Sequence, residues 1–185
     1  MKTPAYGSLD RAHLVATAFA LLEDEGLDRL SMRRLAARLG VQAPALYWHV
    51  RDKGELLGLM ASAIYAAAYA GVGDVQGDWR AWLRAFGTAL RASLAAHRDG
   101  VHLCAGAHPV AQGSAEEQAR RIAAPAVALG LTQEQALAYQ AAVISFTLGW
   151  ATFEANGPMR DHLHAMMDFP AAFTTGLDAL VRGLG

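Results

Sequence analysis

The sequence has little of what secreted scaffolds and strand-rich proteins need. Its single cysteine excludes an internal disulfide, so nothing indicates a secreted disulfide framework. The β-branched residues Val, Ile and Thr are sparse while Ala and Leu dominate, a composition that favours helices over strands. Residues 1–15 carry charges and no apolar run, so we expect no signal peptide. Together these absences predict a cytoplasmic, helical protein.

The best candidate for a membrane span is an uncharged run of nineteen residues from Gln135 to Phe153. The run also contains the polar residues Gln140, Ser145 and Thr147. Such a mixture is typical of a helix that is buried in a core or faces a second subunit. We therefore expect no membrane partner.

The chain has almost no net charge, −1 overall, but its charges are unevenly spread. Six basic residues and one acidic residue lie between Arg29 and Lys53, which gives this segment a charge of +5. From Val101 to the end, four basic and seven acidic residues give −3. A cationic patch on a neutral chain indicates a polyanionic partner at that end only. The alternative is a solvated helix face.

Caps, glycines and prolines divide the chain into helices, and no strand alternation stands out. Each expected helix begins at a capping residue or a proline and ends at a glycine or another break. We expect helices at 8–26 (capped by Ser8), 31–40, from 44, 53–69, 78–97, 114–129, 132–155 and from about 167. Residues 100–109 are expected to be irregular, and 155–158 to form a break. The predicted fold class is all-α.

Residues 31–50 meet the requirements of a helix-turn-helix. Ala36 is small enough for two helices to cross closely, Gly40 suits a left-handed turn, and Leu46 can hold the second helix on a core. The second helix begins at Pro44, and its first residues would enter the major groove of DNA. Nearby basic residues would neutralise phosphates. A purely structural helical hairpin is the alternative.

The segment LSMRRLAARLGVQAPALYWHVRDKGELL, residues 30–57, resembles the DNA-binding end of TetR-type transcriptional repressors. Three later segments resemble the ligand-binding core of the tetracycline-repressor branch. They are HRDG at 97–100, LGLTQEQAL at 129–137 and FTLGWATFE at 146–154.

The resemblance implies a helix-turn-helix DNA-binding domain at 1–52 and a ligand-binding and dimerisation domain at 53–185, linked by the helix 53–70. It further implies a homodimer that binds a palindromic operator in double-stranded DNA. A small-molecule effector would move the fourth helix and release the DNA. The resemblance implies neither catalysis nor a cofactor.

The same resemblance assigns residues to the DNA interface. Arg33 is expected to read a guanine, while Tyr47, His49 and Lys53 match positions that hold backbone phosphates. The tetracycline repressor has hydrogen-bonding side chains where this chain has alanines, so the operator should differ. The residues expected at DNA are Arg33, Arg34, Gln42, Ala43, Pro44, Ala45, Tyr47, His49 and Lys53.

Several residues of this region have structural alternatives. Trp48 is expected to be a core aromatic, because its neighbours form a packing face. His49 could act as a C-terminal helix cap. Arg34 and Arg38 could pair with the acidic cluster at 23–25. We favour Arg33 and Lys53 as DNA contacts.

The histidines of the central region raise the question of a metal. His102, Cys104 and His108 have no repeated ligand pairs, so we expect no metal site, although such a site stays open. His97 belongs to the family-like HRDG turn and is expected to be structural. In tetracycline-binding relatives a histidine at the position of Cys104 coordinates the drug's magnesium, and Ser145 replaces a second family histidine. Both changes argue against a magnesium–tetracycline effector.

An apolar, aromatic effector pocket is the expectation that remains. The resemblance places aromatic and aliphatic residues around the cavity, with a few polar ones among them. The residues expected at the effector are Tyr69, Trp82, Phe86, His102, Cys104, His108, Tyr139, Ser145 and Phe146. Tyr65, Leu90, Ile122, Val143 and Trp150 are expected on the surrounding helices. Each of these aromatic side chains could instead be an ordinary residue of the hydrophobic core.

The helix 133–153 is too apolar all round for the surface of a monomer. With the final helix it could form a four-helix bundle across a twofold axis, which predicts a homodimer. Two other classes of function compete with a DNA-binding regulator. An enzyme would depend on Cys104 near His102 and His108, without any supporting motif. A helical small-molecule-binding or interaction protein would bind DNA without sequence preference.

Overall fold

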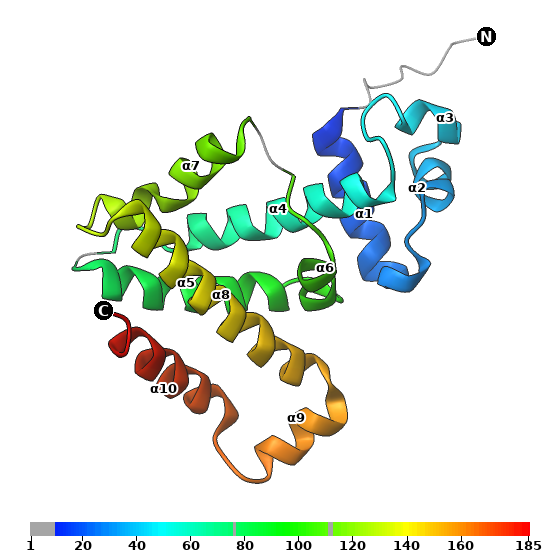
Figure 1. Cartoon of the computed structure of the whole chain (residues 1–185). Helices are drawn as coiled ribbons and strands as arrows, with labels where there is room; N and C mark the ends of the chain where they lie inside the picture. The colour runs from blue at the N-terminus through cyan, green and yellow to red at the C-terminus, as the bar shows by residue number, and fades with distance from the viewer. Residues whose placement is uncertain (1–9, 76, 111–112) are drawn as a thin grey trace.

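The computed structural model describes residues 10–75, 77–110 and 113–185 (Figure 1). Over these ranges it contains helices and no strand, which confirms the predicted all-α class. The helices are α1 (Arg11–Glu25), η1 (Leu27–Arg29), α2 (Met32–Leu39), α3 (Ala43–Leu46), α4 (Lys53–Gly71), α5 (Trp79–Ala95), α6 (Gly100–Gly106), α7 (Ala115–Val127), α8 (Gln133–Ala155), α9 (Gly157–His164) and α10 (Phe169–Arg182).

Helices α1, α2 and α3 form an N-terminal head whose helix ends follow the local sequence. Asp10 caps α1 by accepting the backbone N–H of His13 at 2.7 Å, whereas the predicted cap Ser8 lies outside the described residues. Gly26 ends α1 with a φ of +82°, and Gly40 ends α2 with a φ of +69°. Both values lie in the left-handed region that glycine adopts without strain. The predicted ends of these two helices are confirmed.

Helix α4 leads from the head into the larger part of the molecule (Figure 1). Asp52 caps it by accepting the N–H of Glu55 at 2.8 Å. It packs against α1 in the head and against α5 and α6 beyond the head. Leu56, Met60 and Ile64 are each no more than 1% exposed along this path. One helix therefore belongs to both halves of the chain.

The core beyond the head is built around α5 and α8. Helix α5 packs on α4, α8 and α10, and α8 also packs on α7. Glycine at 87 permits the close approach of α5, because a Cβ there would come within 3.0 Å of side-chain atoms of Leu177 and Val143. Capping boxes begin α7 (Ser114 with Glu117) and α8 (Thr132 with Gln135), each with both of its hydrogen bonds, so the predicted starts of these helices are confirmed.

The HRDG turn between α5 and α6 closes the end of α1. The Arg98 guanidinium donates to the carbonyl oxygens of Glu23 and Asp24, both at 3.2 Å, in the last turn of α1. The Asp99 carboxylate accepts the N–H of Leu27 at 2.9 Å. The His97 ring stacks on the ring of Phe19 in α1, with centroids 4.3 Å apart, so the predicted structural role of His97 is confirmed. Core and head are therefore joined here as well as through α4.

Two segments differ from the prediction. Residues 100–106, expected to be irregular, form α6, because Val101, Leu103 and Cys104 bury their side chains in the core. Residues 157–164 form α9, where a break was expected. Asn156 caps α9, and Pro158 stands in its first turn, where a missing N–H costs no intrahelical bond. The glycine–proline pair starts a helix here.

Helix α8 contains the uncharged run of the sequence. Within the described chain it is long and apolar enough, by length and composition alone, to cross a membrane. However, α5, α7, α9 and α10 all pack against it. Only 28% of its most apolar window is buried inside the monomer, and Phe153 near its end is 45% exposed.

A substitution at Gly58 tests how closely α4 packs against the segment that follows α6. A Cβ at this position would lie 2.4 Å from the carbonyl oxygen of His108 and 3.0 Å from a side-chain carbon of Val110. Gly58→Ala should therefore lower the free energy of unfolding by about 1–3 kcal/mol, measured by urea denaturation. Gly106→Ala, where the added Cβ meets open space, is the matched control and should change stability by less than about 1 kcal/mol. Equal effects of the two substitutions would contradict the packing.

Candidate DNA interface and core cavity

The turn between α2 and α3 has the geometry that the sequence predicts. Beyond the left-handed glycine, the N–H of Val41 donates to the carbonyl of Ala36 at 3.0 Å. Ala36 is 3% exposed and Leu46 is fully buried, so both predicted contact positions are filled as expected. Pro44 stands in the first turn of α3. Helices α2 and α3 therefore form a helix-turn-helix.

The outer face of this motif carries one uncommitted arginine beside small side chains. Arg33 is exposed, and within the described chain it makes no hydrogen bond or ion pair. Gln42 and Pro44 are exposed at the start of α3, while Ala43 and Ala45 are half-buried. The motif thus presents the positive charge of Arg33 and a helix N-terminus with small side chains to any partner.

Arg34 and Arg38, by contrast, form ion pairs within the head. Arg34 pairs with Glu25 and Arg38 pairs with Asp24. The structural alternative for these two arginines is confirmed. Arg34 remains about half exposed and is still open to a second partner, but part of its charge is already compensated.

The aromatic pair after α3 does not enter the core. Trp48 is 88% exposed and Tyr47 is 53% exposed, so the prediction of Trp48 as a core aromatic is wrong. Helix α3 is only four residues long, and Leu46 and Val50 occupy the inward positions on either side of the pair. A hydrogen bond from the N–H of Val50 to the carbonyl of Leu46 closes this turn and leaves both rings outside.

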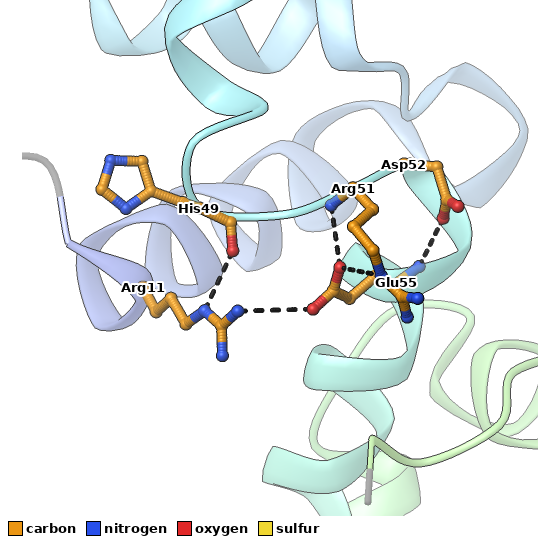
Figure 2. A network of polar contacts seen from close by, with 5 residues as sticks. All are labelled: Arg11, His49, Arg51, Asp52 and Glu55. Atoms are coloured by element: carbon orange, nitrogen blue, oxygen red, sulfur yellow. Dashed lines mark hydrogen bonds and ion pairs between the residues drawn. The ribbon is translucent and has the colours of Figure 1, made fainter.

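Figure 2 shows a polar network that ties the end of α3 to α1 and α4. Arg11, at the start of α1, donates from Nε to the carbonyl oxygen of half-buried His49 at 2.9 Å. Its guanidinium also lies 3.4 Å from the Glu55 carboxylate. Glu55 in turn accepts the backbone N–H of Arg51 at 2.8 Å and its Nε–H at 3.0 Å. The segment that precedes α4, with half-buried Lys53 at its end, is held at three points.

A cavity of about 530 Å³ lies on the core side of α4. Helices α4, α7 and α8 and the segment after α6 supply its walls. The lining residues are Ser62, Tyr65, Ala66, Tyr69, Pro109, Val110, Gln118, Arg121, Ile122 and Ile144. Its size and mainly apolar walls are those of a site for a drug-sized molecule.

A hydrogen-bonded pair fixes one end of this cavity. The hydroxyl of Tyr69 donates to the Gln140 side-chain oxygen at 2.8 Å. The Gln140 amide donates to the carbonyls of Ile122 and Ala136, so this 1% exposed side chain is fully satisfied. Gln140 is not among the residues predicted at the site. The feature of the sequence that could have identified Gln140 is its position as a polar residue inside the uncharged run at 135–153.

Three of the expected aromatic or aliphatic residues line the cavity: Tyr65, Tyr69 and Ile122. Trp82 and Phe86 lie behind it in the core. The Phe86 ring stacks on Tyr69 at 4.8 Å, and Trp82 stacks on Phe86 at 5.3 Å. These two rings support the wall without forming its surface.

The remaining expected residues lie away from the cavity. Tyr139 packs on Trp79 with ring centroids 5.3 Å apart, and Phe146 packs on Phe173 at 5.6 Å between α8 and α10. Ser145 is exposed on α8. The helical period alone could not decide which side of α8 faces the cavity, because α8 is apolar on all sides.

His102, Cys104 and His108, for which a metal site was left open, do not form a cluster. His102 lines a separate hollow of about 320 Å³ near the end of α8, and His108 is exposed. Cys104 is 5% exposed, and burial raises the pKa of its thiol to about 12, so the thiol stays protonated and unreactive at neutral pH. Among the described residues no three His, Cys, Asp or Glu side chains are placed to share a metal ion.

The Glu55 network makes a prediction about pH. Hydrogen bonds from Arg51 to the carboxylate hold the pKa of Glu55 below its usual value. Its contribution to stability is therefore present above the pKa of the unfolded chain and is lost as pH falls through the lower folded pKa. Unfolding free energies of the natural chain and Glu55→Gln should differ by a constant amount above about pH 5, and the difference should shrink towards pH 3.

Glu116→Gln provides the control for this titration. Glu116 also pairs with an arginine four residues away, Arg120, but its side chain is 75% exposed against 9% for Glu55. We expect little change in stability from this substitution at any pH. A pH-independent difference for Glu55→Gln would contradict the network.

Two family models match the chain in the places that the geometry singles out. Residues 14–60, which hold the helix-turn-helix and the start of α4, match the model of bacterial regulatory proteins of the tetR family. Residues 73–170, which hold most of the core, match the tetracyclin repressor-like C-terminal domain.

Known relatives agree with both models over nearly the whole chain. The tetracycline repressor protein class A from transposon 1721 of Escherichia coli is 33% identical over 92% of this chain and 88% of its own. The structure of a TetR variant from Acinetobacter baumannii AYE in complex with minocycline superimposes with a TM-score of 0.78 and 32% identity, over 95% of this chain and 96% of that one. The structure of BioQ with its double-stranded DNA operator superimposes with a TM-score of 0.70 and 32% identity, over 96% of this chain and 98% of that one. The chain belongs to the TetR family of bacterial transcriptional regulators.

Proposed function

We propose that this regulator is a cytoplasmic homodimer that represses transcription from a palindromic operator and leaves it when a small apolar or aromatic effector fills the core cavity. The proposal assigns DNA binding to 1–52 and effector binding and dimerisation to 53–185. One observation carries it: α4 begins directly under the helix-turn-helix and later supplies Ser62, Tyr65 and Tyr69 to the cavity wall. A ligand there contacts the helix that supports the head.

The exposed face of the helix-turn-helix supports the DNA contacts. Arg33 is free within the described chain to offer its fork of donors to guanine O6 and N7. Ala43, Pro44 and Ala45 would fit against base edges by shape, with Gln42 beside them. Exposed Tyr47 and Arg34, together with His49 and Lys53, would face phosphates.

The outward surface of α8 supports the homodimer. Most of its apolar window is not buried in the monomer, and Phe153 is 45% exposed. Helix α10 lies beside α8, so the two could pair with their copies across a twofold axis. Two heads per dimer would then read two half-sites, which is how a single short recognition helix gains sequence specificity.

The cavity supports an effector other than magnesium–tetracycline. Minocycline is the ligand in the solved TetR variant from A. baumannii. The thiol of Cys104 is a poor ligand for a hard metal ion such as Mg²⁺, and neither Cys104 nor Ser145 lines the cavity. The relatives are regulators and not enzymes, and a protonated, buried Cys104 gives no support to a catalytic thiol.

Selection from random duplex DNA tests the proposal. The purified protein should enrich a palindrome whose half-sites lie about one helical turn or slightly more apart. Binding should weaken steeply with salt. Enrichment of no sequence at moderate salt would instead favour a helical small-molecule-binding or interaction protein.

Arg33→Ala should weaken binding to the selected operator by about 1–3 kcal/mol and relax the preference for one base pair in each half-site. Arg38→Ala is the matched control, because Arg38 lies on the same helix and is paired with Asp24. It should change operator affinity much less. Fluorescence anisotropy with labelled operator duplex measures both. Equal losses for the two variants, without a change in base preference, would remove Arg33 from the base-reading role.

A further inference from the structure

We propose that the core cavity binds an uncharged, flat, largely apolar molecule that carries a hydrogen-bond acceptor, such as a ketone, and that this acceptor bonds to the hydroxyl of Tyr65. The rings of the ligand would lie against Tyr69 and the aliphatic wall. This inference rests on the proposed function only in taking the cavity as the effector site, and it adds the chemical class of the effector.

Two of the three hydroxyl groups in the cavity wall are already committed to the protein. The Ser62 hydroxyl donates to the carbonyl of Gly58 at 2.8 Å and accepts the N–H of Val110 at 3.0 Å. The Tyr69 hydroxyl donates to the side chain of Gln140 at 2.8 Å. A hydroxyl has a single proton to donate, so neither group has a donor left for a ligand.

The third hydroxyl belongs to Tyr65, which lies one turn before Tyr69 on α4 and lines the cavity with it. Within the described chain the Tyr65 hydroxyl makes no hydrogen bond. Burial raises the pKa of Tyr65 to about 12, so the donor proton stays in place at neutral pH. An unpaired donor in an apolar wall favours a ligand that brings an acceptor to it, because a ligand without one would leave the donor unsatisfied.

The charge distribution of the wall favours an uncharged ligand. Arg121 on α7 is exposed, already interacts within the chain, and also lines the neighbouring hollow of about 550 Å³ together with Glu117. Every other residue that lines the cavity is uncharged. A charged ligand would therefore lose its hydration against uncharged walls, at a cost that an uncharged ligand avoids.

The rest of the wall favours flat rings. The Tyr69 ring stacks on Phe86, and the rings of Phe86 and Trp82 lie within 7° of parallel. This stack holds the ring of Tyr69 as a flat surface. Ile122 and Ile144 add aliphatic contacts. A planar ring system that covers these residues removes apolar surface from water while its edge remains available to the Tyr65 hydroxyl.

Two probes of nearly the same shape test the role of the acceptor. 9-Fluorenone and fluorene share one planar ring skeleton, and only fluorenone carries a ketone oxygen. Equilibrium dialysis against an excess of the full-length protein at pH 7 gives an affinity for each probe. Fluorene is the more apolar of the two, so the informative quantity is the ratio of the fluorenone affinity to the fluorene affinity, compared between variants.

Tyr65→Phe should lower this ratio about fivefold, as the loss of one hydrogen bond between uncharged groups gives. Tyr139→Phe is the matched control, because Tyr139 packs on Trp79 and does not line the cavity. It should leave the ratio unchanged. Tyr69→Phe should also keep the ratio, because the proton of Tyr69 is already donated to Gln140.

A second pair of probes tests the preference for an uncharged ligand. Fluorenone-2-carboxamide and fluorenone-2-carboxylate differ in charge and little in shape. We expect the amide to bind about tenfold more tightly, because the carboxylate loses more hydration on entering an apolar cavity. Arg121→Gln should preserve the preference for the amide.

The inference would be overturned by an unchanged ratio in Tyr65→Phe or by an equal fall in either control variant. Tighter binding of the carboxylate, or no binding of fluorenone or fluorene, would overturn it as well. Operator binding measured on the same samples separates these outcomes from failure of the proposed function. A protein that binds operator but fails these tests would remain a regulator with another effector class. A protein that passes them but selects no operator would keep the ligand class and lose the regulatory role.

Discussion

The structure depends on α4 remaining one continuous helix. It packs against α1 in the head, and beyond the head it forms part of the cavity and of the core against α5. A helix with buried residues along its whole length moves as a unit, because bending it would break backbone hydrogen bonds and open the packing around Met60 and Ile64. Any shift that a ligand imposes at Tyr65 or Tyr69 is therefore carried to the base of the head.

The head is attached to this helix by contacts of different chemistry. At one end, charged groups centred on Glu55 fix the residues between the recognition helix and α4. At the other, Arg98 and Asp99 from the core hold the end of α1. Apolar packing can slide, but these directional bonds specify one orientation. Two fixed points make the head follow the core, which is what release of DNA by a distant ligand requires.

Local chemistry made the head predictable. Caps, left-handed glycines and the small residue at a helix crossing act over a few positions, so Ala36, Gly40 and Leu46 could be placed from the sequence. The cavity depends on which sides of apolar helices meet, and the sequence around α8 is apolar on all sides. Phe146 and Tyr139 were therefore assigned to the cavity but pack elsewhere, while Gln118, Arg121 and Gln140 were missed. The prediction for Trp48 was wrong for a related reason. The four-residue helix α3 has only one inward position, and Leu46 occupies it.

Coupling between the cavity and the head is open to a direct thermodynamic measurement. The affinity of the tightest-binding cavity ligand should be compared between the free protein and the protein–operator complex. If α4 couples the two sites, the ligand must bind the complex more weakly, and by the same factor by which it weakens operator binding. Equal ligand affinities in the two states, with the ligand shown to occupy the cavity, would mean that α4 does not transmit the signal.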